Sequence, residues 1–509
     1  MTQSQERELK FETGTHTAVP DLSSIPGVST VLGPDEVRLH ATYFDTADLD
    51  LIRAKITLRH RTGGSDEGWH LKLPPAKGAR TEVHEALSPL EDGPPPELLA
   101  MVRSRLRGGE VRPIAEIINN RRTCRLADQH GEVLAEVTDD AVTARSLRAD
   151  ADQESKWREW EAELGSGDEN LLQAIRRCLL DAGAHDSPVP SKLARALGTL
   201  PEKRQHASFD QGTAGGLVLD ALLGHIETFK AFDPRVRLDE DDSVHQMRVA
   251  ARRIRSIIRA YRRVFDTAVA DPVESELQWI ARVLGAARDA EVMAERLQAL
   301  IDEQPRGSVP RAVQQRLVGG QHSAYRDALD DVLKAFESDR YFALIGSLDT
   351  LVTRTAFARN ARKPADEAVT RALGQLYRKA KQTEQQARSA KGTADHDPLL
   401  HKLRKQCKRL RYAGELVSKA HNSRDVHKYA KQVRKAAETL QETLGEHQDG
   451  VITRALLDEA ARLAEAAGED TAAYETLARH EQDLADAAVR RYRPQWQALK
   501  QKTGRSADG

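Results

Sequence analysis

A histidine followed by basic residues at helical spacing occurs twice in the second half of the chain. Basic residues follow His245 at +3, +7, +8 and +10, and they follow His401 at the same four distances. At 100° per residue, positions 0, +3, +7 and +10 of a helix lie within about 80° of one another. The spacing predicts two cationic stripes: a first stripe of His245, Arg248, Arg252 and Arg255, a second stripe of His401, Arg404, Lys408 and Arg411, with Arg253 and Arg409 beside them.

Like charges within a stripe repel one another, so the stripes are either solvated helix faces or binding surfaces for an anion. The same spacing with a histidine at the same place, found twice, favours the anion. Guanidinium and imidazolium groups suit phosphate oxygens, which guanidinium binds in pairs. Tyr261 and Tyr412 form no stacking ladder, so a polyanion without bases is favoured over single-stranded nucleic acid.

Each stripe is followed by a second shared sequence motif of six residues, which we call its Leu-Gly word. Residues 284–289 read Leu-Gly-Ala-Ala-Arg-Asp, and residues 444–449 read Leu-Gly-Glu-His-Gln-Asp. The two stripes are 156 residues apart, which is too long a period for a solenoid. We therefore expect an all-α region built from two pseudo-symmetric helical bundles.

The first half of the chain carries charged residues at strand spacing instead. In Glu6-x-Glu8-x-Lys10 the two carboxylates and the amine point to one face of a strand, because side chains alternate along strands. Further strands show the same pattern: Arg59 with Arg61, Lys72, Arg80 with Glu82, Arg121 or, as the less favoured alternative, Arg122, Glu136 with Asp140, and Glu159 with Glu161 and Glu163. If the sheet curls so that these faces converge, carboxylates would hold Mg²⁺ or Mn²⁺ and cations would hold a polyphosphate chain. Metal and cations together would neutralise charge in phosphoryl transfer.

These residues require two kinds of architecture along the 509-residue chain. Period-two patterns in residues 1–165 predict an α+β domain with an antiparallel sheet, and long helices begin near residue 214. Charge divides in the same place: residues 1–200 hold 25 Lys and Arg against 33 Asp and Glu, whereas residues 201–509 hold 52 against 45. We expect a first domain over 1–200, a linker over 201–214, a helical domain over 215–500 and a disordered tail over 501–509.

Several classes of protein are excluded or disfavoured. Three scattered cysteines form neither a disulfide scaffold nor a zinc site, and no window approaches 18 apolar residues, so we expect a cytoplasmic protein. P-loop, Rossmann and hydrolase-elbow motifs are missing. Four aromatic residues are interpreted as packing rather than ligand-binding groups, and two isolated histidines as structural: Tyr43, Phe44, Trp157, Trp160, His70 and His84.

The two stripes and the two Leu-Gly words together resemble the CHAD family, the conserved histidine α-helical domain, over about residues 215–495. The resemblance implies two four-helix units flanking a basic channel that binds inorganic polyphosphate. His245 and His401 match the helix-start histidines of the family, and His447 matches the histidine of its second word. The first copy has Ala287 at that position, so its contribution would come from Arg288. Asp289 and Asp449 are expected to orient the facing arginines and histidines, with metal binding as the less favoured alternative.

In the first half, the opening Glu-x-Glu-x-Lys, Tyr-Phe-Asp-Thr at 43–46 and the charged strands in order resemble the CYTH family, the triphosphate tunnel metalloenzymes, over residues 5–200. The resemblance implies an eight-stranded antiparallel tunnel that hydrolyses or cyclises triphosphates. It implies that Glu6, Glu8 and Lys10 are catalytic. The metal ligands would be Glu6, Glu8, Glu161 and Glu163, and the triphosphate-binding cations would be Lys10, Arg59, Arg61, Lys72, Arg80, Arg121 and Lys192.

Our leading hypothesis is a metal-dependent inorganic triphosphatase whose helical domain targets it to polyphosphate, with possible association with polyphosphate granules. One alternative is a non-catalytic polyphosphate-binding protein of such granules. A second alternative within the same fold is an adenylate cyclase or an organic triphosphatase. No membrane and no specific nucleic acid are expected as partners.

Overall fold

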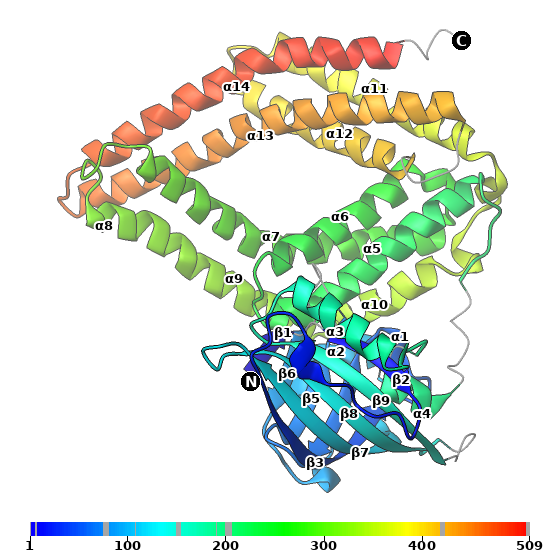
Figure 1. The fold of residues 1–509 in the computed structure, drawn as a ribbon. Helices are drawn as coiled ribbons and strands as arrows, with labels where there is room; N and C mark the ends of the chain where they lie inside the picture. The colour runs from blue at the N-terminus through cyan, green and yellow to red at the C-terminus, as the bar shows by residue number, and fades with distance from the viewer. Residues whose placement is uncertain are drawn as a thin grey trace. The chain divides into compact units, whose positions relative to one another are not determined.

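The computed structural model describes residues 2–5, 8–74, 81–106, 108–148, 154–189, 191–198, 206–417 and 423–504. The chain divides into two compact units, Met1–Arg204 and Gln205–Gly509. In Figure 1 the first unit is drawn in blue to green-cyan and is rich in strands, and the second is drawn in green to red and is helical. This confirms the predicted fold class, an antiparallel sheet domain with helices followed by a largely helical region.

One antiparallel sheet forms the first unit, with the strand order β1-β6-β5-β4-β3-β7-β8-β9-β2-β10. Charged and apolar residues alternate along these strands, which gives the sheet two different faces. The described strands are β1 (Thr2–Gln5), β2 (Glu8–Thr13), β3 (Thr30–Asp45), β4 (Thr57–Thr62), β5 (Gly68–Lys72), β6 (Thr81–Glu85), β7 (Arg112–Ala127), β8 (Val133–Ser146), β9 (Glu154–Leu164) and β10 (His185–Asp186).

β1 and β2 are consecutive in the chain but stand near opposite ends of this strand order. β1 pairs with β6, and β2, only two residues further on, pairs with β9. The sheet is therefore closed into a tunnel by two consecutive strands. When β1 and β2 are counted as one segment and the two-residue β10 is left aside, the described strands form the eight-stranded antiparallel arrangement that was predicted.

The two faces of the sheet pack against different helices. α3 (Glu169–Asp181) covers the face opposite the charged residues, where Phe11 and Trp160 lie in its core. α4 (Lys192–Leu197) packs on the charged face, against an apolar group that includes Tyr43 and Trp157. Both tryptophans are thus buried packing residues, as expected. α1 (Asp50–Arg53) and α2 (Pro96–Leu106) complete the helices described in this unit.

The second unit is built from long helices around one large apolar core. A separate apolar group joins the far ends of α7 and α13 to α8 and α14. The described helices are α5 (Ala214–Arg237), α6 (Ser243–Ala260), α7 (Thr267–Asp302), α8 (Arg311–Gln314), α9 (Gly320–Phe336), α10 (Asp339–Leu351), α11 (Ala365–Ser389), α12 (His396–Val417), α13 (Arg424–Ala466) and α14 (Ala472–Gly504). The first stripe and its Leu-Gly word lie on α6 and α7, and the second pair lies on α12 and α13.

Two further observations concern the chain as a whole. α14 runs to Gly504, four residues into the segment 501–509 that was expected to be a disordered tail, and the remaining residues lie outside the described ones. Within the described ranges, none of the helices has a stretch long and apolar enough to cross a membrane.

Candidate functional sites

Strand register brings the charged residues of the first unit together in rows. Across β2, β9 and β8, one row places Glu8 opposite Glu163 and Glu163 opposite Glu136. The row two positions along pairs Lys10 with Glu161. The next row is formed by Glu12, Glu159 and Asp140, with Arg121 of β7 facing Asp140. The period-two patterns seen in the sequence therefore converge on one face of the tunnel.

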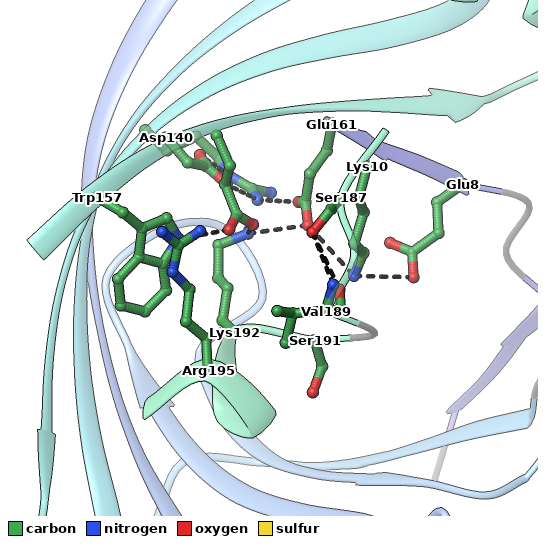
Figure 2. A network of polar contacts seen from close by, with 12 residues as sticks. Glu8, Lys10, Asp140, Trp157, Glu161, Ser187, Val189, Ser191, Lys192 and Arg195 are labelled. Atoms are coloured by element: carbon green, nitrogen blue, oxygen red, sulfur yellow. Dashed lines mark hydrogen bonds and ion pairs between the residues drawn. The ribbon is translucent and has the colours of Figure 1, made fainter. Parts of the chain in front are cut away.

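Lys192 lies at the centre of this face. Its Nζ is 2.9 Å from Asp140 Oδ2, 2.6 Å from Glu159 Oε1 and 2.8 Å from Glu161 Oε1. Figure 2 shows the side chain pointing from α4 toward Asp140 and Glu161. Burial alone would lower the pKa of Lys192, but the three carboxylates outweigh burial and raise it. Lys192 therefore stays charged and acts as an internal counter-ion.

The carboxylates of this group form a compact cluster. One oxygen each from Asp140, Glu159 and Glu161 lie within 4.8 Å of one another. Arg121 closes the network, with its Nη2 2.6 Å from both Asp140 Oδ2 and Glu161 Oε2. Burial would raise the pKa of Glu161, but the neighbouring cations Lys192, Lys10 and Arg121 hold it well below its usual range.

Lys10 links this cluster to the acidic row that contains Glu8. Its Nζ lies 3.1 Å from Glu8 Oε1 and 3.3 Å from Glu161 Oε1 (Figure 2). Burial disfavours its charge, yet Glu161 and Glu8 together raise the pKa of Lys10 above its ordinary value. The predicted Lys10 and the predicted carboxylates Glu8 and Glu161 are thus in direct contact.

Two further predicted cations, Arg59 and Lys72, pair with one buried carboxylate, Glu82. Arg59 Nη2 is 3.5 Å from Glu82 Oε1, and Lys72 Nζ is 3.1 Å from Glu82 Oε2. Glu82 Oε1 also lies 2.8 Å from His70 Nδ1, which makes His70 a structural partner, in line with its interpretation from sequence. Arg61 pairs with Asp66, and burial together with Arg59 lowers the pKa of Arg61 to about 9.

Two of the predicted residues, Glu6 and Arg80, lie outside the described residues. The sequence grouped Glu82, Asp140 and Glu159 with the carboxylates of the converging strands but did not place them among the expected metal ligands. The structure shows them as internal counter-charges. The signal was present, since Glu136 and Asp140 share a strand face with the same four-residue spacing as Glu159 and Glu163. What was missing was the register that sets these strands side by side.

In the second unit, the two stripes meet at their centres. The positive charges that lower the pKa of Lys408 come from both copies, Arg252 and Arg248 on α6 and Arg404 and Arg411 on α12. Arg252 Nε donates to Tyr412 Oη at 2.9 Å, which joins the two helices directly. We call these five cations the basic cluster: Arg248, Arg252, Arg404, Lys408 and Arg411.

Carboxylates from neighbouring helices partner the outer members of the stripes. Arg248 Nη1 lies 2.8 Å from Asp289 Oδ1, and Arg411 Nη2 lies 2.9 Å from Glu438 Oε1. Arg404 Nη2 is 4.0 Å from Asp449 Oδ1. The aspartates of the two repeated words therefore face the arginines, as expected from the sequence.

Arg252 and Lys408 differ from these neighbours. Among the residues that the structure describes, neither forms an ion pair with a carboxylate. Burial, followed by the charges of Arg252 and Arg404, lowers the pKa of Lys408 to about 6. The centre of the basic cluster thus holds positive charge that the described part of the protein does not neutralise.

The remaining predicted residues lie around this centre or apart from it. Arg253 pairs with Glu415 at 2.9 Å and Arg288 with Glu291 at 2.9 Å. Arg255 lies 3.7 Å from Glu274, and Arg409 contributes positive charge at the same place. Burial lowers the pKa of His245 and of His401, and stripe arginines add to the effect in both. His447 instead contacts Asp397, with Nε2 3.3 Å from Oδ1.

Comparison with known proteins agrees with this division of the chain. Residues 4–196 match the model of the CYTH domain, and residues 220–458 match that of the CHAD domain. The chain belongs to the CYTH–CHAD proteins. Two uncharacterized proteins of Mycobacterium tuberculosis, from strains CDC 1551 / Oshkosh and H37Rv, are each 38% identical over 494 residues, which cover 94% of this chain and 93% of theirs.

Two solved structures are also similar to part of this chain. The CHAD domain from the plant Ricinus communis is 22% identical, with a TM-score of 0.44, and the match covers 60% of this chain and 97% of that one. PptA from Streptomyces chartreusis is 20% identical, with a TM-score of 0.45, and the match covers 56% of this chain and 99% of that one.

Enzymes of the CYTH family are metal-dependent triphosphatases or adenylate cyclases.

Proposed function

We propose that the CYTH domain is a metal-dependent inorganic triphosphatase and that the CHAD domain binds inorganic polyphosphate. The observation that carries the proposal is the convergence of carboxylates and cations on one tunnel face by strand register. The carboxylates supply hard oxygen ligands for a divalent cation, and the lysines and arginines supply donors for phosphate oxygens. Both groups are required to transfer a phosphoryl group from a highly charged chain.

The residues on this face fit Mg²⁺ or Mn²⁺ in the row that contains Glu8. Glu8 lies directly opposite Glu163, which in turn lies opposite Glu136. Like charges directly opposite one another destabilise a sheet, so a cation bound there would lower the energy of the row. By contrast, the cluster of Asp140, Glu159 and Glu161 already holds the ammonium of Lys192.

We therefore assign the metal to Glu8 and Glu163. Glu161, which also contacts Lys192, and Glu6 are the further candidate ligands from the sequence. A bound divalent cation would supply Lewis acidity and charge neutralisation for the triphosphate. The chain's own cations would do the remaining work. Lys10 stands between Glu8 and Glu161, where it can contact a phosphate oxygen next to the metal.

Arg59 and Lys72 would bind phosphate by exchanging Glu82 for a phosphate oxygen, and Arg61, Arg121 and Lys192 would orient the chain. Such preorganised cations stabilise the charge that develops as the bridging oxygen leaves. At one end of this face, α4 packs against Trp157 and Tyr43, and this apolar group keeps water from that side.

The CHAD domain would bind long polyphosphate through the basic cluster. Neither Arg252 nor Lys408 has a carboxylate partner among the described residues. An external polyanion would therefore neutralise the charge of Arg252 and favour the protonated form of Lys408, whose pKa the neighbouring arginines lower. Because both domains belong to one chain, polyphosphate held by one would raise the effective concentration of chain ends near the other.

The test is phosphate release from tripolyphosphate, ATP and long-chain polyphosphate with Mg²⁺ or Mn²⁺. We expect phosphate from tripolyphosphate, and Glu8→Gln should lower the rate at least about 100-fold because a hard cation loses one charged ligand. Glu36→Gln is the matched control, since Glu36 is an exposed residue paired with Arg122. An unchanged rate in Glu8→Gln would refute the metal assignment, and cyclic AMP with pyrophosphate from ATP would replace hydrolysis by cyclisation.

A further inference from the structure

Two glycines occupy equivalent places in the repeated words, Gly285 on α7 and Gly445 on α13. Both lie in the interior of long helices, where glycine costs about 0.5–1 kcal/mol relative to alanine. Neither has the positive φ that would favour glycine. Their backbone conformation therefore does not explain why a side chain is missing at both places.

Arginines of the basic cluster lie against both glycines. A Cβ built on Gly445 would be 3.2 Å from Nη2 and 3.3 Å from Nε of Arg404. A Cβ on Gly285 would be 3.7 Å from Nη2 of Arg248, which is an ordinary van der Waals contact. At each glycine, the helix surface therefore lies against a guanidinium group. We call this surface the seat of the arginine, and the contact is closer for Arg404 than for Arg248.

The two seats also differ in what else holds the arginine. Arg248 donates to Asp289, four residues beyond its glycine, at 2.8 Å. Arg404 is 4.0 Å from Asp449, and its buried Nε has no hydrogen-bond partner among the described residues. Arg404 therefore depends more on the shape of its seat than Arg248 does.

We propose that Gly445 is a positioning residue of the polyphosphate site: the missing Cβ lets the guanidinium of Arg404 lie against α13, at the distance from Lys408 that the site requires. Gly285 provides the equivalent, looser seat for Arg248. This inference rests on the proposed binding of polyphosphate by the CHAD domain. A methyl group at 445 would push Arg404 off α13 by a few tenths of an ångström, and a larger side chain would displace it from the seat.

The experiment measures the affinity of the full chain for long-chain polyphosphate, in a chelator so that the CYTH domain cannot hydrolyse the ligand. We expect Gly445→Ala to weaken binding about 3–10-fold, equivalent to roughly 1 kcal/mol, and Gly445→Leu to weaken it further. Gly285→Ala should change affinity less than Gly445→Ala. Gly346→Ala on α10 is the control, because nothing lies within 4 Å of its Cβ position.

Melting temperature separates positioning from a structural role. Alanine and leucine are better helix formers than glycine, so the Gly445 variants should melt at the same or a higher temperature while binding less tightly. Affinity and melting temperature that fall together would overturn the proposal. So would a Gly445→Ala protein that binds polyphosphate like the parent.

A double-mutant cycle identifies the partner. If Gly445 acts through Arg404, the Gly445→Ala change should have no effect on affinity in an Arg404→Ala background. Equal losses in both backgrounds would overturn the assignment to Arg404. Failure of the proposed function looks different, since the parent would then bind no better than the Arg252→Ala/Lys408→Ala variant, and that result would overturn both proposals.

Discussion

Lys192 in the CYTH domain and Lys408 in the CHAD domain are both largely buried, but their surroundings are opposite. Lys192 lies within 3 Å of three carboxylates, which raise its pKa. Lys408 lies among arginines, and its pKa falls to about 6 because of burial and their charge. A buried charge is tolerated when it is paired, and an unpaired one shifts toward its neutral form.

The difference indicates two ways of preparing a site for phosphate. The tunnel neutralises its own charges, so the proposed metal ion and triphosphate would have to exchange partners with residues already in contact. The basic cluster leaves its central charges uncompensated, so a polyanion adds the counter-charge that the described residues lack. The first arrangement favours selectivity for a particular ligand, and the second favours any dense line of negative charge.

The largest effect is expected where an internal counter-ion is removed. Lys192→Met would leave Asp140, Glu159 and Glu161 facing one another without their shared cation. Breaking a buried ion pair in this way typically costs about 3–5 kcal/mol. Urea unfolding of the full chain should show that loss in the transition of the CYTH domain, with the CHAD transition unchanged. An unchanged CYTH transition would show that the tunnel does not depend on Lys192 for its charge balance.

Removal of the uncompensated charges should instead affect ligand binding. We expect Arg252→Ala/Lys408→Ala to weaken polyphosphate binding at least about tenfold and to reduce its dependence on salt, because two contacts to phosphate are lost. The control removes two exposed cations that form surface ion pairs, Lys334→Ala/Arg462→Ala. Equal losses in both double variants would mean that only overall charge matters.

Replacing lysine by methionine should destabilise the tunnel at position 192 but stabilise the helical domain at position 408. Between pH 6 and about 10 the unfolded chain carries a proton at Lys408 that the folded chain has released, so stability contributed by this group rises with pH through that window. Lys408→Met removes the cost and should raise the melting temperature by about 2–4 °C per kcal/mol gained. The gain should be larger at pH 6.5 than at pH 9.5. A lower melting temperature in the variant would contradict the unpaired state of Lys408.

The smallest expected effect is the uptake of a proton when polyphosphate binds. Phosphate beside Lys408 should raise its pKa, so binding near pH 7 should take up a proton, and affinity should increase as pH falls from 8 to 6. Burial lowers the pKa of His245 and of His401, which shifts their contribution toward lower pH than that of an ordinary histidine. Calorimetry in two buffers of different ionisation enthalpy measures the uptake. Lys408→Arg, which keeps the charge, should reduce it, and unchanged uptake would assign the proton elsewhere.

Periodicity in the sequence was enough to place residues on faces but not to choose their partners. Glu161 and Lys10 could be assigned to one face of each strand because side chains alternate, and the structure confirms the faces. Their contact depends on which strands are neighbours and in what register, which is set by the whole sheet. For this reason the pairing of Glu82 and Asp140 with cations inside the tunnel was not predicted.

The helical repeat also predicted the positions of residues but not all of their partners. The spacing after each histidine predicted the stripes, and the shared words predicted the aspartates that face them. The repeat could not show that Arg252 and Lys408 meet across α6 and α12, since this depends on how the two copies pack. His447 matched a family position, yet its contact is Asp397, a residue outside either repeated word.

The two strands that close the tunnel also determine when the site can form during synthesis. The segment with β1 and β2 emerges first, whereas β9, the partner of β2, ends at Leu164. At about 5–20 residues per second, translation of the intervening chain of about 150 residues takes roughly 8–30 s. Throughout that time Glu8 and Lys10 lack their cross-strand partners. The charged face is therefore completed only after β9 and then α4 with Lys192 have been made. An intermediate with the first segment undocked would be folded over much of the sheet but would lack the proposed metal ligand Glu8.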